Sequence, residues 1–261
     1  RLAEPGRRRR WLEDTTRAMH VTEIGIELAR LPAGLEGFRI VHLSDLHHEF
    51  AQEVALHAAE LAAESECDLV LVTGDFVVHR VTPGLENVLA ALGRSRAALG
   101  VWGILGNHDI WHDRDAVEHA LDRHGLRRIT NRAEDLVTPG GRVRLIGVEH
   151  PWRRVEDWPG LIGAGEALRI VLSHTPDNFR RLARLGVDLV LAGHTHGGQW
   201  RLPFIGSLVV PSRHGRGYDQ GVFERDGAVL HVSRGVGSVG IPLRINCPPE
   251  ITRVTLHRPG G

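Results

Sequence analysis

Acidic and metal-binding side chains follow five short apolar runs of this sequence, at the point where each run ends. The segments are Asp45-Leu46-His47, Gly74-Asp75, Gly106-Asn107-His108-Asp109, Ser173-His174 and Gly193-His194-Thr195-His196. In open α/β sheets, ligands collect at the carboxyl ends of strands, because the loops converge there over a rigid base. Five polar strand ends that converge in this way would build one site.

The residue types in these segments favour a pair of metal ions. The candidate ligands are Asp45, His47, Asp75, Asn107, His174, His194 and His196. Alternate residues of an extended segment point the same way, so we expect Asp45 to face in the direction of His47, and His194 in that of His196. One ion takes about four to six ligands, so this set suits two ions bridged by a carboxylate. Mixed imidazole and carboxylate ligation suits Zn, Fe or Mn and leaves the metal's identity open.

Such a site would act on phosphate esters. Two divalent ions, two carboxylates and one hydroxide leave a net charge of about +1, which attracts an anionic phosphate and its transition state. A metal pair about 3.5–4 Å apart lowers the pKa of a bridging water toward about 7 and stabilises the entering and leaving oxygens. The predicted reaction is in-line attack of a metal-bridged hydroxide on phosphorus.

The order of these motifs resembles that of the calcineurin-like metallophosphoesterase superfamily. The pattern D-x-H, G-D, G-N-H-D, a lone H and G-H-T-H carries the resemblance, which extends from about Leu35 to the C-terminus. Residues 208–221, 232–244 and 247–251 are similar to a bacterial subgroup that is often membrane-associated or exported. The resemblance implies an α/β (α+β) fold, a four-layer αββα sandwich of two mixed sheets flanked by helices.

The resemblance also implies individual roles. The first metal would be held by Asp45, His47, Asp75 and His196, with Asp75 as the bridge, and the second site would be completed by Asn107, His174 and His194. His108 would stabilise or protonate the leaving group, and Asp109 would orient His108. In the loop region after residue 198, Arg213 and His214 are candidates for substrate binding, since a guanidinium grips phosphate with two hydrogen bonds. Arg234 and Arg244 flank a Gly-rich segment and can equally be structural, and Trp102 and Trp111 are expected to pack around the third strand end.

Hydrophobic patterning predicts alternating strands and helices followed by a strand-rich closing segment. The predicted strands are 21–28, 38–45, 68–75, 100–109, 143–149, 168–174, 187–194, 207–210, 228–233 and 250–257. The predicted helices are 52–64, 85–92, 113–124 with Asp113 as N-cap, and 176–186. The runs at 68–75 and 187–194 are continuously apolar, which is typical of strands buried on both faces.

Composition narrows the function classes. The 261 residues carry 32 basic and 32 acidic side chains, so no global field recruits nucleic acid or a membrane. All the basic residues are arginine, which excludes Schiff-base and P-loop lysine chemistry. No apolar run reaches the roughly 18 residues needed to cross a bilayer. Cys67 and Cys247 allow one disulfide, but two inert buried thiols are favoured.

Two regions are expected. Residues 1–18 form a tail with Arg7 to Arg10 and Trp11, which is either solvated or follows a lost anchor or export signal, because the chain starts on Arg1 and not on methionine. Residues 19–261 form a single domain.

The predicted function is a binuclear phosphoesterase for phosphomonoesters or phosphodiesters, lipid-linked or wall-linked phosphates included. The alternative is a catalytically silent metal-binding scaffold for a protein partner. Peripheral association with a membrane or cell wall, or export, is favoured over a cytoplasmic location; substrate and oligomeric state stay open.

Overall fold

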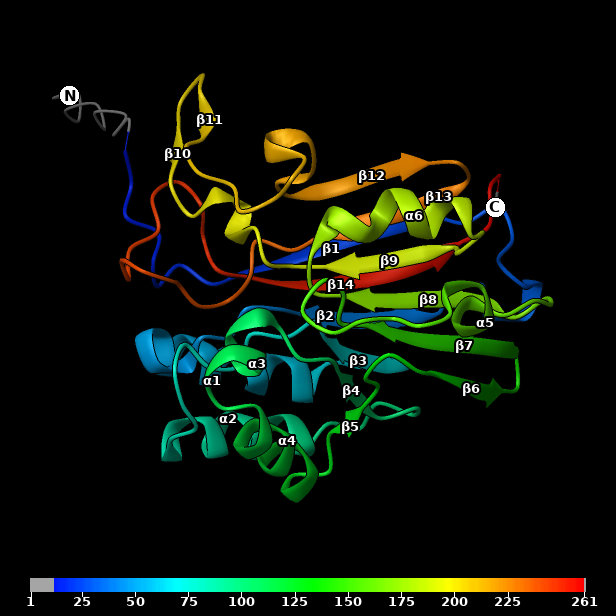
Figure 1. Cartoon of the computed structure of the whole chain (residues 1–261), viewed down its shortest axis with the longest axis horizontal. Helices are drawn as coiled ribbons and strands as arrows, with labels where there is room; N and C mark the ends of the chain where they lie inside the picture. The colour runs from blue at the N-terminus through cyan, green and yellow to red at the C-terminus, as the bar shows by residue number, and fades with distance from the viewer. Residues whose placement is uncertain (1–11, 261) are drawn as a thin grey trace, which may run out of the picture.

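Two six-stranded sheets form the centre of the protein, whose residues 12–260 the computed structural model describes (Figure 1). The first sheet has the order β1 (His20–Glu27), β14 (Glu250–His257), β2 (Arg39–Leu43), β3 (Leu69–Val72), β4 (Val101–Gly103) and β5 (Arg127–Arg128). β14 runs parallel to β1 and antiparallel to β2, and β2 to β5 are parallel. The sheet is therefore mixed.

The second sheet is also mixed. Its order is β12 (Gly221–Arg225), β13 (Ala228–Val232), β9 (Leu189–Ala192), β8 (Leu168–Ser173), β7 (Gly141–Val148) and β6 (Ala133–Thr138). The two edge strands β12 and β6 are antiparallel to their neighbours, and the inner strands are parallel. A separate hairpin joins β10 (Arg201–Leu202) to β11 (Gly206–Ser207). The predicted strands 21–28, 38–45, 68–75, 143–149, 168–174, 187–194, 228–233 and 250–257 each overlap one of these strands.

The sheets pack face to face and carry helices on their outer faces. Leu69 and Leu71 of β3 lie in one buried cluster with Leu189 and Leu191 of β9, between the sheets. On the outside of the first sheet pack α1 (His48–Glu64), α2 (Pro83–Gly93) and α4 (Arg114–Arg123), and on the outside of the second α5 (Trp158–Ile162) and α6 (Phe179–Arg184). The short α3 (Asn107–His112) precedes α4, and the 3-10 turns are Ala33–Leu35, Pro176–Asn178, His196–Gly198 and Gly215–Tyr218. The four-layer αββα prediction is confirmed.

Three local predictions are wrong. Residues 100–109 are not one strand, because β4 ends at Gly103 and helix α3 begins at Asn107. Residues 207–210 are not one strand, because β11 ends at Ser207 and Val209 beyond it is 71% exposed. Asp113 stands at the N-cap position of α4, but its side chain makes no capping bond there and instead accepts the N–H of Val81 at 3.1 Å.

The beginning of the described chain is tied to the C-terminal region. Asp14 forms an isolated bridge with Ile245, and the N–H of Thr15 donates to the carbonyl of Arg244 at 2.8 Å. Arg7 to Arg10 and Trp11 lie outside the described residues. Both cysteines are free, Cys247 buried and Cys67 half-buried, where burial raises the pKa of the Cys67 thiol to about 11. Within residues 12–260 no helix is both long and apolar enough to span a membrane.

Candidate metal centre

Left-handed turns, and not strand alternation, position the predicted ligands. β2 ends at Leu43, before Asp45 and His47, and β9 ends at Ala192, before His194 and His196. Asp45, His47, Asp75, His194 and His196 all have positive φ, between 38° and 68°. Non-glycine residues adopt this conformation at a cost of order 1–3 kcal/mol each, and such strain concentrates at functional sites. The prediction that His194 and His196 share a direction is therefore wrong; their side chains enter different clusters.

The first cluster consists of Asp45, His47 and His196, all buried. The Nε2 atoms of His47 and His196 are 3.2 Å apart, and Nε2 of His196 lies 3.5 Å from Oδ1 of Asp45. Two imidazole nitrogens and a carboxylate oxygen thus converge on one point. A cation placed there would find three ligands, two imidazoles and one carboxylate, of the types that Zn, Fe and Mn accept.

The second cluster consists of Asp75, His174 and His194. Nε2 of His174 lies 3.1 Å from Oδ1 of Asn107, so the amide belongs to the same group. Oδ2 of Asp75 is 3.3 Å from Nε2 of His174 and 3.4 Å from Nε2 of His47. Asp75 therefore lies between the clusters, within contact distance of one histidine from each.

Backbone carbonyls turn two imidazoles toward the centre. Nδ1 of His47 lies 3.0 Å from the carbonyl of Val77, and Nδ1 of His174 lies 2.7 Å from the carbonyl of Thr73. A carbonyl only accepts, so each Nδ1 carries a proton and each Nε2 is the ring atom that faces the centre. This is the arrangement in which neighbouring groups orient metal-binding histidines, and the residues present fit a metal pair.

Burial sets the protonation of the cluster. It lowers the pKa of His47 to about 4 and that of His194 to about 3, which keeps both imidazoles neutral, the form that binds metal. Burial also raises the pKa of Asp45 to about 6. Burial works against a charge on His174, but the adjacent Asp75 carboxylate outweighs it and raises the His174 pKa to about 9. The buried carboxylates of Asp75 and Asp45 thus favour a positive charge on His174. A bound metal cation would supply that positive charge instead.

The Asp109 carboxylate links the loops that carry Asp75 and Asn107. Oδ1 accepts the N–H groups of Phe76 and Val77 at 2.9 and 3.1 Å. Oδ2 accepts those of Asp75 and Gly106, both at 2.9 Å. Burial, followed by the charge of Asp75, raises the Asp109 pKa to about 8, whereas the four N–H donors favour the ionised form. Because all four partners are donors, only the carboxylate satisfies them, and we take Asp109 as ionised.

His108 reaches Asp109 only indirectly. Its Nδ1 lies 2.9 Å from the carbonyl of Val78, and its backbone N–H donates to Oδ1 of Asp75 at 2.9 Å. The resemblance implied that Asp109 orients His108 directly, whereas the His108 ring contacts the Val78 carbonyl instead. All four hydrogen bonds to Asp109 come from backbone N–H groups, and Asp109 acts on the segment that ends in the Val78 carbonyl.

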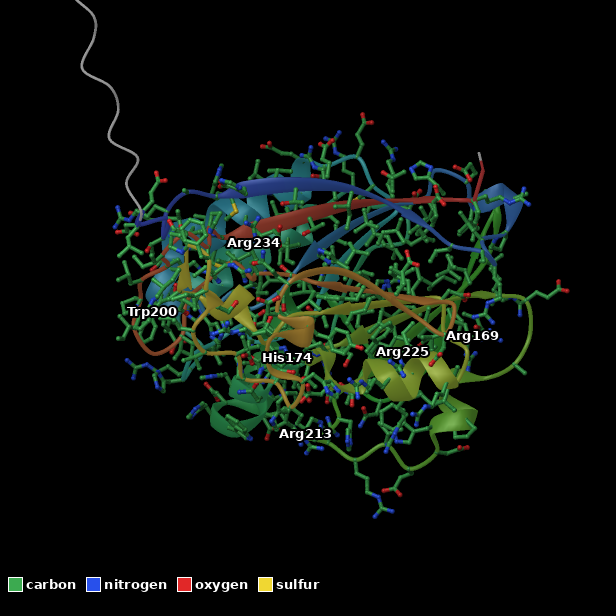
Figure 2. The ribbon with its side chains drawn as sticks, turned by 90° about the horizontal axis from the view of Figure 1, so that it is seen from above. Arg169, His174, Trp200, Arg213, Arg225 and Arg234 are labelled. Carbon is green, nitrogen blue, oxygen red and sulfur yellow. The ribbon has the colours of Figure 1, made fainter. Side chains whose placement is uncertain are left out.

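Arg213 and His214 lie on a loop anchored near the second cluster. The backbone N–H of Arg213 donates to both carboxylate oxygens of Asp177, at 3.2 and 3.1 Å, and the ring of His214 packs edge-on against Tyr218. Figure 2 shows His174 in the interior and Arg213 toward the outer edge of the molecule. The hydrogen bonds to Asp177 fix the backbone of Arg213. The role of the Arg213 and His214 side chains in substrate binding stays a prediction.

Arg244 is a buried residue of the site that the sequence left undecided between functional and structural roles. Its guanidinium is fully enclosed and donates to the carbonyls of Arg234 and Gly237, the former at 2.8 Å. One of its nitrogens lies 3.3 Å from Nδ1 of His196. Arg244 therefore supports the first cluster from behind. A lone arginine in a Gly-rich segment carries no sequence signal for burial, so only the fold could reveal this.

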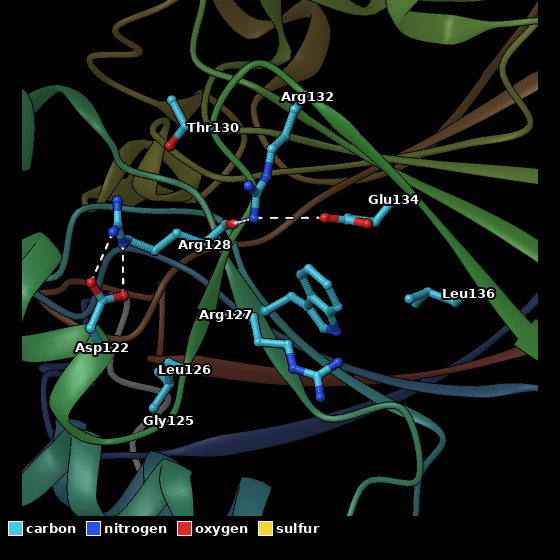
Figure 3. A pocket seen from close by; sticks show the side chains of 10 residues that line it. Asp122, Gly125, Leu126, Arg127, Arg128, Thr130, Arg132, Glu134 and Leu136 are labelled. Atoms are coloured by element: carbon cyan, nitrogen blue, oxygen red, sulfur yellow. Dashed lines mark hydrogen bonds and ion pairs between the residues drawn. The ribbon is translucent and has the colours of Figure 1, made fainter.

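A surface cavity beside Trp102 and β5 lies away from the clusters (Figure 3). Its arginines already have partners: Arg128 pairs with Asp122 at 2.9 Å, and Arg132 lies 3.8 Å from Glu134. Arg127 lies over the ring of Trp102, 5.2 Å from its centroid. The cavity holds no group of metal-binding residues, so we assign the chemistry to the clusters.

Comparison with known proteins agrees with this assignment. The calcineurin-like phosphoesterase family model matches residues 38–198. The chain is 31% identical over 245 residues to the metallophosphoesterase YkuE of Bacillus subtilis, covering 91% of this chain and 85% of YkuE. It is 30% identical over 224 residues to the phosphodiesterase YaeI of Escherichia coli, covering 84% and 82% of the two chains. The fold is similar to that of the sulfate thiohydrolase SoxB of Thermus thermophilus, with a TM-score of 0.50, 13% identity, and coverage of 85% of this chain and 57% of SoxB. The chain therefore belongs to the calcineurin-like phosphoesterase family and is a metal-dependent phosphoester hydrolase.

Proposed function

We propose that this chain is a binuclear phosphoesterase that hydrolyses phosphomonoesters or phosphodiesters. The observation that carries the proposal is the position of Asp75, whose Oδ2 contacts His47 from one cluster and His174 from the other. A carboxylate between two ligand groups is what a bridged metal pair requires. The name of the relative YaeI, a phosphodiesterase, supports including diesters.

When bound, the two metal ions would supply an activated water nucleophile and stabilise the charge that develops on the phosphate. Asp45, His47, Asp75 and His196 would hold one ion, and Asp75, Asn107, His174 and His194 the other. The chain itself contributes a rigid cage, because backbone carbonyls fix the rings of His47 and His174.

His108 would serve the leaving group. The Val78 carbonyl takes the hydrogen bond of Nδ1, so Nε2 is the atom left to hold a proton for the departing oxygen. Asp109 would position His108 through residues 75–78. We further propose that Arg213 and His214 bind the phosphate or its substituent from the loop anchored on Asp177.

A metal and activity measurement tests the proposal. Protein reconstituted with Mn²⁺ should contain two metal ions per chain and release nitrophenol from nitrophenyl phosphate or bis(nitrophenyl) phosphate. His108→Ala should lower the rate about 10²–10⁴-fold, the range for loss of a general acid, with metal content unchanged. The matched control is His119→Ala, an exposed histidine on α4, which should retain activity.

The same measurement has an outcome that would decide against catalysis. If protein with two metals per chain turned over no phosphate ester, the scaffold alternative would stand in place of the hydrolase.

We propose residues 19–261 as one domain and a location at a membrane or cell wall, or outside the cell. Support for the location comes from the bacterial subgroup resemblance and from a Danio rerio relative, 27% identical over 257 residues, which is named a transmembrane protein with a metallophosphoesterase domain. That relative is longer, and the chain covers 57% of it. Fractionation of cells that express the native gene would test this location; recovery in the cytosolic fraction alone would contradict it.

A further inference from the structure

Two tryptophans meet beside the candidate metal centre. The ring centroids of Trp111 and Trp152 are 6.4 Å apart, and the ring planes are inclined at 81°. The pair, which we term the aromatic corner, therefore has two apolar walls nearly at right angles. Trp111 was expected to pack around the third strand end, as the buried Trp102 does, but Trp111 is 61% exposed. The expectation is wrong because α3 turns that side chain outward.

The aromatic corner spans the groups proposed to act on the ester. The Trp152 ring lies edge-on to the rings of His174 and His194, with centroid distances of 5.3 and 5.2 Å. The Trp111 ring lies 6.1 Å from that of His108. The corner thus connects the second cluster to the residue assigned to the leaving group. A substituent on the departing oxygen would emerge next to His108 and meet Trp111.

Buried polar groups hold the corner in place. Trp152 lies in a turn where the N–H of Arg153 donates to the carbonyl of Glu149 at 2.9 Å. The fully buried carboxylate of Glu149 accepts the N–H of Leu105 at 3.1 Å and the hydroxyl of Thr130 at 2.8 Å. Leu105 directly precedes the segment that begins α3 and carries Trp111. One carboxylate therefore ties together the two chain segments that present the walls.

We propose that the aromatic corner binds a planar ring in the leaving group, so that the preferred substrates are phosphoesters of alcohols or phenols that carry an aromatic ring. This proposal rests on the phosphoesterase function proposed above. Stacking of a flat ring on an exposed tryptophan face raises binding affinity by about tenfold per ring. A cationic substituent fits less well, since a metal-loaded centre keeps net positive charge beside the corner.

A matched substrate pair isolates the stacking. Benzyl phosphate and cyclohexylmethyl phosphate have rings of similar size and alcohols of similar basicity, and differ in planarity; their methyl diesters extend the pair to diesterase activity. Mn²⁺-loaded wild-type protein should show about tenfold higher kcat/KM for the benzyl ester. Trp111→Leu should abolish this preference, and Trp111→Phe should restore most of it.

Binding without turnover gives an independent readout. Calorimetric titration with benzylphosphonate and cyclohexylmethylphosphonate should show tighter binding of the benzyl compound to wild-type protein and equal binding to Trp111→Leu. Equal kcat/KM for both esters, or a benzyl preference that survives Trp111→Leu, would overturn the aromatic corner while leaving the phosphoesterase function intact. Failure of the metal-loaded wild-type protein to hydrolyse any ester would overturn both.

Discussion

Replacement of Asp109 by asparagine tests whether one carboxylate holds the metal-binding loops together. The change keeps the size of the side chain but exchanges one oxygen for an NH₂ group. Each oxygen of Asp109 accepts two backbone N–H groups, so two buried donors would then face a third donor. An unsatisfied buried donor costs about 1–3 kcal/mol, which gives roughly 2–6 kcal/mol for the pair.

We expect the lower part of that range, about 2–4 kcal/mol, as the loss in unfolding free energy. The reason is that the variant also removes a buried negative charge beside Asp75, the interaction that, after burial itself, raises the pKa of Asp109 to about 8. Metal affinity should fall as well, by about 10–100-fold, because the loops of Asp75 and Asn107 lose their common anchor.

Urea unfolding in the presence of a chelator, followed by tryptophan fluorescence, measures the stability term, and an unchanged m-value shows that the compared states are the same. Mn²⁺ titration calorimetry measures the affinity term. The matched control is Asp113→Asn, since Asp113 accepts a single N–H, from Val81, and an amide oxygen can still accept it. If Asp109→Asn lost no more stability than Asp113→Asn, the carboxylate would not be the anchor inferred here.

Three further predictions concern charge and metal. Mn²⁺ at 100 times its Kd should raise the unfolding free energy of the wild-type protein by about 2.7 kcal/mol per site, and Asp75→Asn should remove most of this gain in thermal or urea unfolding. His231, whose Nδ1 lies 3.1 Å from that of His42, has its pKa lowered by burial to about 4, so the unfolded chain binds the extra proton and stability falls as the pH drops from about 6.5 to 4. The loss from His231 should reach about 3 kcal/mol, and urea unfolding of His231→Gln across this range should show a smaller loss; an unchanged pH dependence would contradict the assignment. Arg244→Met should lower the unfolding free energy by about 3 kcal/mol, because the carbonyls of Arg234 and Gly237 lose a buried donor; a loss below about 0.5 kcal/mol would show that water replaces it.

The parts of the fold that could be predicted are those encoded in side-chain hydrophobicity. Continuous apolar runs such as 68–75 and 187–194 indicated strands buried on both faces, and β3 and β9 lie within them. The edge strands β6 and β12 were not predicted. Most of their side chains are polar or at least partly exposed to solvent, so neither strand forms a continuous apolar run. Hydrophobic patterning has little to detect in such strands.

The candidate site divides in the same way. The residue types of the ligand set and their position after strands could be predicted, because metal binding demands particular side chains. The left-handed turns at Asp45 and His194 could not, since φ is set by the surrounding loops and not by these residues alone. The burial of Arg244 and the exposure of Trp111 depend on which segments pack across them, and local sequence does not contain that information.

The position of β14 also affects how the protein can be made. β1 pairs with β14 along its whole length, and β14 separates β1 from β2 in the first sheet. A chain leaving the ribosome therefore presents β1 without its partner until about 230 further residues have been added, which takes on the order of tens of seconds at ordinary rates of synthesis. Until then the edge of β2 is open to other chains. The loop that carries Asp45 directly follows β2, so we expect metal loading to come only after β14 has been synthesised and added to the sheet.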